Sequence, residues 1–402
     1  MASTTTQVPG GPCRVLVVAD DLTGAAEIGG ICRECGLTAT ILRSTGGNWA
    51  IDRPDADALI LDTDSRAVAP DAARAVARRA TDAALCHAGE RGFEVIYKKV
   101  DSAMRGRVVD EIDGMLGSIG LSGALLIPQN PSLGRTIDPA GVYRIGGTPL
   151  ASTAFAHDPT HPAGSSEVRH ILARQGTRCV VTLAGLQDAV RRDGLTVATA
   201  ESVTEVEAWA MRIPTTHLPV GGGDFFAAVL RSRRCCGATR PSRQPTPCDG
   251  TVLVVEGTAS SRPPGVRELP AIAICPMPVD RSPEHWCDAV LRALRSGRRG
   301  VAMTLQGPLD RSPGAPQAIE RAIAAAVMQV LAAWPEGIDR LLITGGATAS
   351  AVCRHLGWGR FAVGEAWIRG VVNLLPTGSS VRITVKPGSY PWPRTVLAGL
   401  VG

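Results

Sequence analysis

Short runs of aliphatic and β-branched residues alternate with longer amphipathic stretches over the first 230 residues of the chain. The aliphatic runs predict strands at 14–19, 38–42, 58–62, 93–99 and 123–127. The amphipathic stretches predict helices near 24–35, 70–88 and 107–118. Strands and helices that alternate in this way form a mostly parallel sheet covered on both faces. We therefore expect residues 1–230 to form an α/β domain.

The same alternation resumes after a polar interruption. Residues 231–250, RSRRCCGATRPSRQPTPCDG, have no apolar period and are rich in Arg, Pro, Ser and Cys, which predicts a linker. Beyond it, strands are predicted near 251–256, 271–275, 300–304, 340–344 and 381–386, with a helix at 315–334. The chain of 402 residues is therefore expected to hold two α/β domains, 1–230 and 251–402, joined by a Pro- and Arg-rich linker.

Residues 128–166 form a long segment rich in Gly, Pro and Thr, and only turn chemistry can be predicted for it. A segment of this length inside a compact domain is more often functional than idle. His157 and His161 stand four residues apart, but a proline-containing stretch holds them rather than a helix, so we do not expect a metal site there.

The most informative strand end is the first. Residues 14–30 read RVLVVADDLTGAAEIGG, so Asp20 and Asp21 fall where open α/β sheets place their ligands, with Thr23 as the predicted N-cap of the next helix. Two carboxylates beside a helix N-terminus disfavour a bare phosphate cradle and suit a magnesium ion, sugar hydroxyls or a general base. The alternative is that one aspartate only caps the helix, but one helix needs only one cap.

Two further strand ends carry chemically useful side chains. The fourth predicted strand ends at Lys99 and is followed by Asp101, Ser102 and Arg105. The third is followed by Arg66, whose guanidinium can hold a carboxylate through two hydrogen bonds. This mixture suits a small polyhydroxy acid, with the cations on its carboxylate and the other groups on its hydroxyls. The alternative for the fourth strand is a structural ion pair at its end. The alternative for the third strand is a capped turn with a surface arginine.

Three glycine turns mark the second half: EGTAS at 256–260, TGGATAS at 344–350 and KPGSYP at 386–391. A strand followed by glycines and a helix can seat a nucleotide phosphate, because glycine lets phosphate approach backbone N–H groups. The chain has neither the GxxxxGK[ST] pattern of ordinary P-loops nor a convincing GxGxxG after its first strand. A nicotinamide-dependent oxidoreductase is therefore disfavoured, although the α/β pattern would allow it.

Composition and charge exclude several classes of protein. Net charge is only +5, without a basic block or interleaved aromatics, which argues against nucleic acid as a partner. No apolar run reaches the ~20 residues of a membrane span, and the N-terminus lacks the pattern of a secretory signal. Eleven cysteines follow no spaced framework, so we expect reduced thiols and a cytoplasmic protein. Lysine occurs only at Lys98, Lys99 and Lys386, which makes these positions candidates for a compact ammonium group.

The ordered motifs resemble those of the four-carbon acid-sugar kinase family, from about residue 14 to 398. The matching segments are ADDLTGAAE, DTDSR, YKKVDSAMRG with EID at 111–113, and the long loop that begins GRTIDPAGVYRIGG. The resemblance implies ATP-dependent phosphorylation of the terminal hydroxyl of threonate, erythronate or an oxo-tetronate. It implies that the first domain holds the sugar acid and that the second holds the nucleotide.

The resemblance also assigns residues. It places the substrate near Asp20, Arg66, Lys99, Asp101 and Ser102. It places ATP near Thr258, Ser260, Gly345, Gly346, Ala347, Thr348 and Gly388. The second half departs from the family pattern: Ala347 stands where an acid is common, Thr258 where serine is usual, and Lys386-Pro387-Gly388 where Lys-Ser-Gly is expected.

The resulting hypothesis is a sugar-acid kinase. Asp20 or Asp21 would contact the attacking hydroxyl, with either of them as the base, while Lys99, Arg66 and Arg105 hold the substrate carboxylate. Magnesium would neutralise the phosphates with help from Lys386, and a cleft between the domains would close over both ligands by a hinge near 231–250. The rival is a non-catalytic sugar-acid-binding or regulatory protein with a degenerate nucleotide site. A homodimer is one option for the assembly.

Overall fold

The computed structural model divides into two compact units, the first made of residues 1–20 and 34–239 and the second of residues 21–33 and 240–402. Thr258, Ser260 and most of the expected linker lie outside the described residues. The described residues are 15–44, 47–51, 56–88, 92–158, 160–173, 175, 181–236, 250–257, 269, 271–306, 312, 314–334, 337–388 and 390–398. Among them, no helix has both the length and the hydropathy that a bilayer crossing requires.

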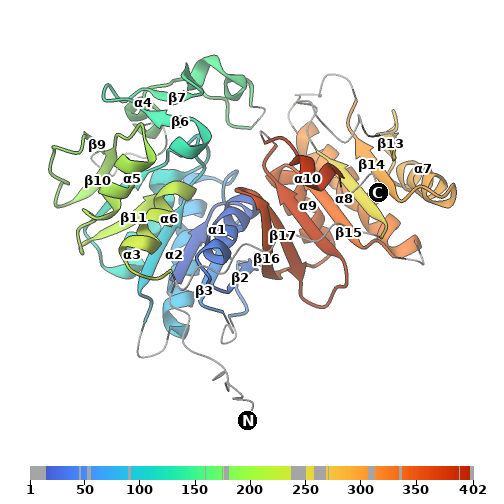
Figure 1. Cartoon of the computed structure of the whole chain (residues 1–402), viewed down its shortest axis with the longest axis horizontal. Coiled ribbons are helices and arrows are strands. Elements are labelled where there is room, and N and C mark those ends of the chain that lie inside the picture. The colour runs from blue at the N-terminus through green and yellow to red at the C-terminus, as the bar shows by residue number, and fades with distance from the viewer. Residues whose placement is uncertain are drawn as a thin grey trace, which may run out of the picture. The chain divides into compact units, whose positions relative to one another are not determined.

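The first unit contains a parallel sheet with the strand order β2–β3–β1–β4–β11–β5–β10–β9 (Figure 1). All the strand pairs within it are parallel, as the sequence predicts. The strands are β1 (Val15–Ala19), β2 (Ala39–Arg43), β3 (Ala58–Asp62), β4 (Val95–Lys99), β5 (Gly123–Ile127), β9 (Val181–Ala184), β10 (Gly194–Ala198) and β11 (His217–Gly221).

Helices cover both faces of this sheet. Alternate residues of β1, Leu16 and Val18, belong to one apolar core together with residues of α2 (Pro70–His87), α3 (Val108–Ile119) and α4 (Val168–Ala173). On the other face the Tyr97 ring packs against Phe225 and Phe226 of α6 (Gly223–Ser232), and α5 (Val203–Ala210) packs against α6. The two-sided burial explains why the strands read as continuous apolar runs rather than alternating ones.

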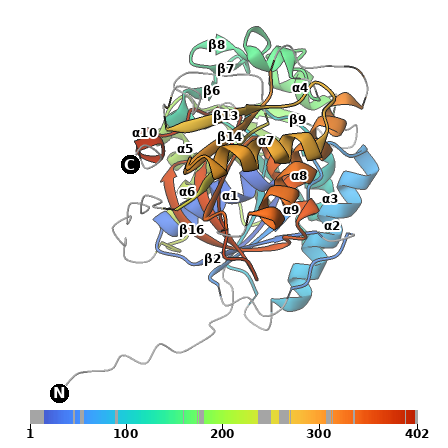
Figure 2. The same cartoon turned by 90° about the vertical axis from the view of Figure 1, so that its right-hand side faces the viewer.

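The segment after β5 is more ordered than the sequence predicts. It forms a small antiparallel sheet of β6 (Arg135–Ile137), β7 (Tyr143–Ile145) and β8 (Thr148–Pro149), which lie together in Figure 2. Three short 3-10 helices accompany it: η1 (Pro131–Leu133), η2 (Leu150–Ser152) and η3 (Ala154–His157). Strands of two or three residues are too short to show a period between so many Gly and Pro residues, so the sequence predicted only turns here.

The second unit contains the strand order β13–β14–β12–β15–β18–β17–β16. The first five strands are parallel: β12 (Val252–Glu256), β13 (Ile272–Pro276), β14 (Gly300–Thr304), β15 (Arg340–Thr344) and β18 (Arg382–Lys386). Two antiparallel strands that the sequence reading did not identify follow them, β16 (Arg360–Ile368) and β17 (Val371–Pro376). Helices α7 (Pro283–Arg295), α8 (Ala315–Ala333) and α9 (Gly346–His355) pack in succession, and α10 (Arg394–Ala398) follows β18.

Residues 22–33 of helix α1 (Leu22–Glu34) belong to the second unit, although strand β1 belongs to the first. Gly29 and Gly30 let it approach the β16–β17 hairpin, since a Cβ atom at Gly29 would lie 2.7 Å from Val363 Cγ2 and one at Gly30 would lie 3.1 Å from Val372 Cγ2. The predicted domain boundaries kept this helix with its strand in residues 1–230. In the structure the chain passes from one unit to the other between Asp20 and Asp21.

Candidate functional site

The strand register brings the predicted polar strand ends of the first unit to one edge of its sheet. Ala19 of β1 pairs with Asp62 of β3 and with Lys99 of β4, and Lys99 pairs with Gly221 of β11. The residues that directly follow these strands therefore emerge side by side. The structure confirms this juxtaposition, which is the geometric premise of the predicted acid-binding site.

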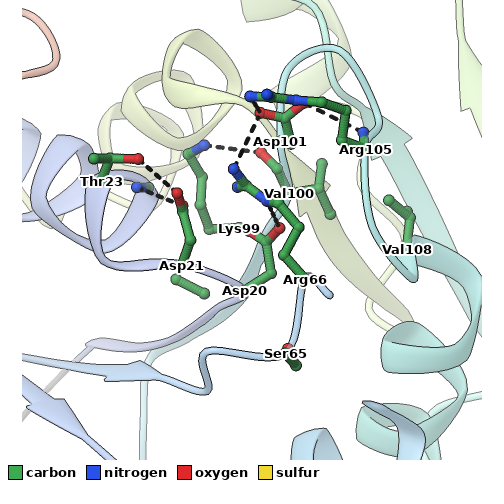
Figure 3. A network of polar contacts seen from close by, with 12 residues as sticks. Asp20, Asp21, Thr23, Ser65, Arg66, Lys99, Val100, Asp101, Arg105 and Val108 are labelled. Carbon is green, nitrogen blue, oxygen red and sulfur yellow. Dashed lines mark hydrogen bonds and ion pairs between the residues drawn. The ribbon is translucent and has the colours of Figure 1, made fainter. Parts of the chain in front are cut away.

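Asp20 sits at this edge with one oxygen engaged and one unengaged. Arg66 Nε donates to Asp20 Oδ2 at 2.7 Å, and the aspartate is only 2% exposed (Figure 3). Asp20 Oδ1 is buried and has no hydrogen-bond partner among the described residues. Burial alone would raise the pKa of Asp20, but Arg66 and Lys98 lower it, and the result is a pKa below the usual range. The site thus presents an ionised acceptor oxygen without a donor.

Asp101 and Arg105 form a second, two-point ion pair beside it. Arg105 donates through Nε to Asp101 Oδ2 at 2.9 Å and through Nη2 to Oδ1 at 2.8 Å, while its Nη1 donates to Asp158 Oδ2 at 2.8 Å. Arg66 Nη1 lies 3.7 Å from Asp101 Oδ1 and links this pair to Asp20 (Figure 3). Burial raises the pKa of Asp101, but Arg105 and Arg66 outweigh burial and hold it well below its usual range.

The small antiparallel sheet and its 3-10 helices contribute residues that the sequence reading did not select. Arg135, at the start of β6, donates to the Ser102 hydroxyl. The guanidinium carbons of Arg105 and Arg135 lie 5.2 Å and 5.8 Å from the centroid of the Phe155 ring. His161 is bound through its backbone N–H to Asp158 Oδ1 at 2.8 Å. These residues lie within the family-like loop, but turn chemistry gave no reason to choose them.

Lys98 is structural and Lys99 faces the site edge. Lys98 Nζ lies 2.6 Å from Glu111 Oε2, and both side chains are almost completely buried. Glu111 Oε1 accepts a hydrogen bond of 2.6 Å from the Ser65 hydroxyl, and the Ser65 N–H donates to the Asp20 carbonyl. Lys99 Nζ donates to the Val100 carbonyl at 2.8 Å. The buried Lys98–Glu111 pair therefore supports the backbone that carries Asp20.

The second unit has a corresponding edge. The carboxyl-terminal residues of its parallel strands pair in register: Thr304 with Glu256, Glu256 with Thr344, and Thr344 with Lys386. The hydroxyls of Thr304 and Thr344 are buried and find no hydrogen-bond partner among the described residues. Lys386 Nζ donates to the Tyr390 carbonyl at 2.6 Å. Burial lowers the pKa of Lys386 to about 8.

The predicted glycine turn lies at this edge and begins α9. Gly345 has a φ of 99°, which favours glycine, and it precedes the first residue of the helix. A Cβ atom at Gly257 would lie 1.7 Å from Thr348 Oγ1, so these two segments touch. Ala347 is exposed in the first turn of α9. Backbone N–H groups at the start of this helix are therefore available to an anion.

Asp21 lies against the same turn. A Cβ atom at Gly346 would lie 2.5 Å from Asp21 Oδ2. Asp21 Oδ1 accepts the Gly24 N–H at 2.8 Å, and Oδ2 accepts the Thr23 hydroxyl at 2.6 Å (Figure 3). The N-cap of α1 is therefore Asp21, and the prediction of Thr23 was wrong because the helix begins one residue before it. The two adjacent aspartates thus belong to different sites.

The side chains near the glycine turn offer few ligands for a magnesium ion. Among the described residues, no group of three or more His, Cys, Asp or Glu side chains gathers in a way that could hold a metal ion. Asp21 offers one carboxylate beside the glycine turn. Magnesium in kinase sites is held by one or two carboxylates together with substrate phosphates and water. Asp21 is therefore sufficient for magnesium only when the phosphates of a bound nucleotide supply further oxygens.

Comparison with known proteins identifies a separate domain for each half of the chain. A model of a sugar-binding N-terminal domain matches residues 15–210, and a model of a nucleotide-binding C-terminal domain matches residues 261–390. The chain is 25% identical to a 3-oxo-tetronate kinase of Methylobacterium radiotolerans, over 93% of this chain and 95% of that protein. It is 34% identical to a D-erythronate kinase of Heliobacterium modesticaldum, over 41% of this chain and 37% of that protein.

The chain belongs to the four-carbon acid-sugar kinase family. Members of this family are phosphotransferases, and so is this chain. Its fold is shared with a crystal structure of a Haemophilus influenzae protein, with a TM-score of 0.69, 19% identity, and coverage of 96% of this chain and 98% of that one. The family assignment, first drawn from four sequence motifs, is confirmed.

Proposed function

We propose that this family member transfers the γ-phosphoryl group of ATP to the terminal hydroxyl of a four-carbon sugar acid such as threonate, erythronate or a 3-oxo-tetronate. The first unit would bind the acid and the second would bind the nucleotide. The observation that carries the proposal is Asp20 Oδ1, a buried and ionised acceptor that lacks a donor among the described residues. A substrate hydroxyl supplies such a donor, and a carboxylate that receives its hydrogen bond orients the oxygen for attack.

The polar neighbours of Asp20 support a polyhydroxy substrate. Arg66 fixes the Asp20 carboxylate through Oδ2, which leaves Oδ1 as the oxygen that would accept the substrate hydroxyl. Ser102 and Asp101 provide further hydrogen-bonding groups along the same edge. In this arrangement Asp20 holds and orients the hydroxyl, and its lowered pKa keeps it ionised throughout the neutral range.

The proposed nucleotide site is the glycine turn that begins α9. Its backbone N–H groups would bind phosphate, Lys386 would add positive charge, and Asp21 would hold magnesium together with phosphate oxygens. Magnesium would neutralise the charge that phosphoryl transfer places on the phosphate oxygens. Thr258, Ser260 and Gly388 remain predicted nucleotide contacts. Ala347 leaves the first turn of α9 without the acid that is common in the family.

The test is ADP release in the presence of threonate, erythronate or a 3-oxo-tetronate, comparing the wild type with Asp20→Asn. Asp20→Asn should lower kcat by a factor of about 10² to 10⁴, the usual contribution of a positioned acid–base group, while the Kd for ATP measured by calorimetry stays unchanged. Asp64→Asn is the matched control, since Asp64 directly precedes Ser65, whose N–H donates to the Asp20 carbonyl, and it is partly exposed with a φ of 50° that asparagine tolerates. It should keep wild-type turnover.

Two results would contradict the proposal. Wild-type turnover in a folded Asp20→Asn variant would remove Asp20 from the reaction. Binding of a tetronate without any ADP release from the wild type would favour the non-catalytic sugar-acid-binding protein instead.

A further inference from the structure

The carboxylate of the substrate needs its own donors, and the two arginines first expected to supply them already bind carboxylates of the protein. Arg66 binds Asp20 at 2.7 Å, and Arg105 binds Asp101 through two hydrogen bonds as well as Asp158. An acid that displaced one of these partners would leave a buried aspartate without its counter-charge, which is costly. Other donors along the same sheet edge are therefore needed for the substrate carboxylate.

The N-terminus of α6 lies on this edge. Gly221, the last residue of β11, pairs with Lys99, and the Val100 N–H donates to the Gly221 carbonyl at 3.1 Å. The next two residues, Gly222 and Gly223, form the N-cap and first position of α6, a helix of ten residues. The Tyr97 hydroxyl fixes the turn by donating to the Gly222 carbonyl at 2.8 Å. The first N–H groups of such a helix have no acceptor within the helix and attract anions.

A second observation comes from Asn130, which is completely buried beside this turn. Its Oδ1 accepts the Asp224 N–H at 3.0 Å, so the orientation of the amide is fixed and Nδ2 is the donor. Nδ2 is buried and makes no hydrogen bond to any of the described residues. An unsatisfied buried donor costs about 1–3 kcal/mol, so it requires an explanation.

The turn at Gly222 packs closely against Asn130. A Cβ atom at Gly222 would lie 2.5 Å from Asn130 Oδ1 and 2.7 Å from the Pro128 carbonyl oxygen. Asp224, the acidic residue of the first turn, is turned to other partners: its two oxygens accept the Ser132 N–H at 2.9 Å and the Ser132 hydroxyl at 2.8 Å.

We propose that Asn130 Nδ2 and the N–H groups of Gly223 and Phe225 at the start of α6 form the subsite for the substrate carboxylate, with Lys99 on the adjacent strand supplying the positive charge. This inference rests on the proposed function, because it names the part of the sugar-acid site that recognises the acid group. The ligand class is a short carboxylate. Hydroxyl recognition stays with Asp20 and its neighbours, so an acid whose carboxylate lies at α6 directs its chain toward them.

The decisive variant is Asn130→Asp, which keeps an oxygen to accept the Asp224 N–H and replaces only the Nδ2 donor with a negatively charged oxygen. The KM for the acid should rise about 10- to 100-fold, as expected when a hydrogen bond to a charged group is lost, while the KM for ATP stays unchanged. The new carboxylate is buried beside Asp224, so the thermal midpoint should fall, and the kinetics are measured well below it. Ser132→Ala is the matched control: it removes a hydrogen bond of the same cluster but should leave the KM for the acid unchanged.

A comparison of substrates separates acid recognition from a structural effect. The wild type should prefer each tetronate to the tetritol of the same stereochemistry, which lacks the carboxylate, and Asn130→Asp should remove most of that preference. If Asn130→Asp keeps the wild-type KM and preference, or if Ser132→Ala raises the KM for the acid equally, the subsite is wrong.

Failure of the subsite can be told apart from failure of the proposed function. If no tetronate supports ADP release, the proposed kinase reaction fails, and the subsite is then tested by calorimetry of tetronate binding to the wild type and to Asn130→Asp. Equal Kd values would refute it. Where Asn130→Asp does not fold, Lys99→Gln is the second variant, and an unchanged KM or Kd for the acid in that variant would likewise refute the subsite.

Discussion

The buried Lys98–Glu111 pair allows a quantitative test of how the site edge is supported. Lys98 Nζ lies 2.6 Å from Glu111 Oε2, and the side chains are 0% and 1% exposed. Lys98→Met keeps the length of the stem and removes the charge, which leaves a carboxylate buried without its cation. Breaking one partner of such a pair costs about 3–5 kcal/mol of unfolding free energy.

The pH dependence of this loss has a definite sign. Burial already raises the pKa of Glu111 in the presence of Lys98, which lowers it, so removal of Lys98 should raise this pKa further. When the pKa of a carboxyl group is higher in the folded state than in the unfolded state, the folded state is less stable once the group is ionised. The free energy of unfolding therefore falls as pH rises through the pKa of the folded state. Lys98→Met should therefore lose less stability at pH 5 than at pH 8.

Urea unfolding followed by circular dichroism at both pH values measures the effect. The double variant Lys98→Met/Glu111→Gln should recover at least half of the loss at pH 8, because its amide is neutral and its oxygen can still accept the Ser65 hydroxyl. Arg78→Ala breaks an exposed ion pair with Asp82 at 3.7 Å and should cost less than about 1 kcal/mol. A loss below about 1 kcal/mol in Lys98→Met, or a loss independent of pH, would refute the reasoning.

Three further predictions concern the nucleotide turn and the acid site. Because burial lowers the pKa of Lys386 to about 8, the KM for ATP should rise between pH 7 and pH 9. Lys386→Met should show a high KM without that rise, and a parallel rise in the variant would exclude the lysine. Gly346→Ala should raise the KM for ATP, since the new Cβ atom would lie 2.5 Å from Asp21 Oδ2. Gly117→Ala is the control and should leave this KM unchanged, because its Cβ atom would meet nothing within 4 Å. Equal KM values in the two variants would contradict the role of a tight turn at Gly346. Asp101 has a lowered pKa, so its stabilisation is present above the unfolded pKa of about 3.9 and is lost as pH falls below that value. The urea midpoint should drop between pH 5 and pH 3 by less in Asp101→Asn than in the wild type.

Most of the parallel strands could be predicted because each is a short, continuous apolar run between turn signals, but β9, β10 and β11 were not predicted. The fourteen residues from Val95 to Val108 show where the prediction stops. Their strand and helix are read from period alone, but the two-point pairing of Arg105 with Asp101 depends on how the intervening turn folds back, as the φ of 55° at Met104 indicates. Such a turn leaves no period in the sequence.

Residues that enter the site from distant segments were harder to find. Asn130 and Arg135 lie in a stretch of Gly and Pro residues, and each becomes informative only through contacts with Asp224 and Ser102. The sequence shows which residue types are present, but not which buried donor lacks a partner. Likewise, nothing in the run from Leu22 to Glu34 indicated that this helix would pack on the β16–β17 hairpin, because the hairpin itself was not predicted.

The paired aspartates show what the structure adds to a motif. At the end of β1, Asp20 is bound by Arg66 within the first unit, whereas Asp21 caps α1 and faces the glycine turn within the second. A strand that turns at once into a helix sends consecutive side chains in different directions, so two adjacent carboxylates can serve two ligands. Under the proposed function, Asp20 would serve the acceptor hydroxyl, and Asp21 would serve the donor phosphates through magnesium. Because the two carboxylates lie against different groups, we expect that neither residue could substitute for the other.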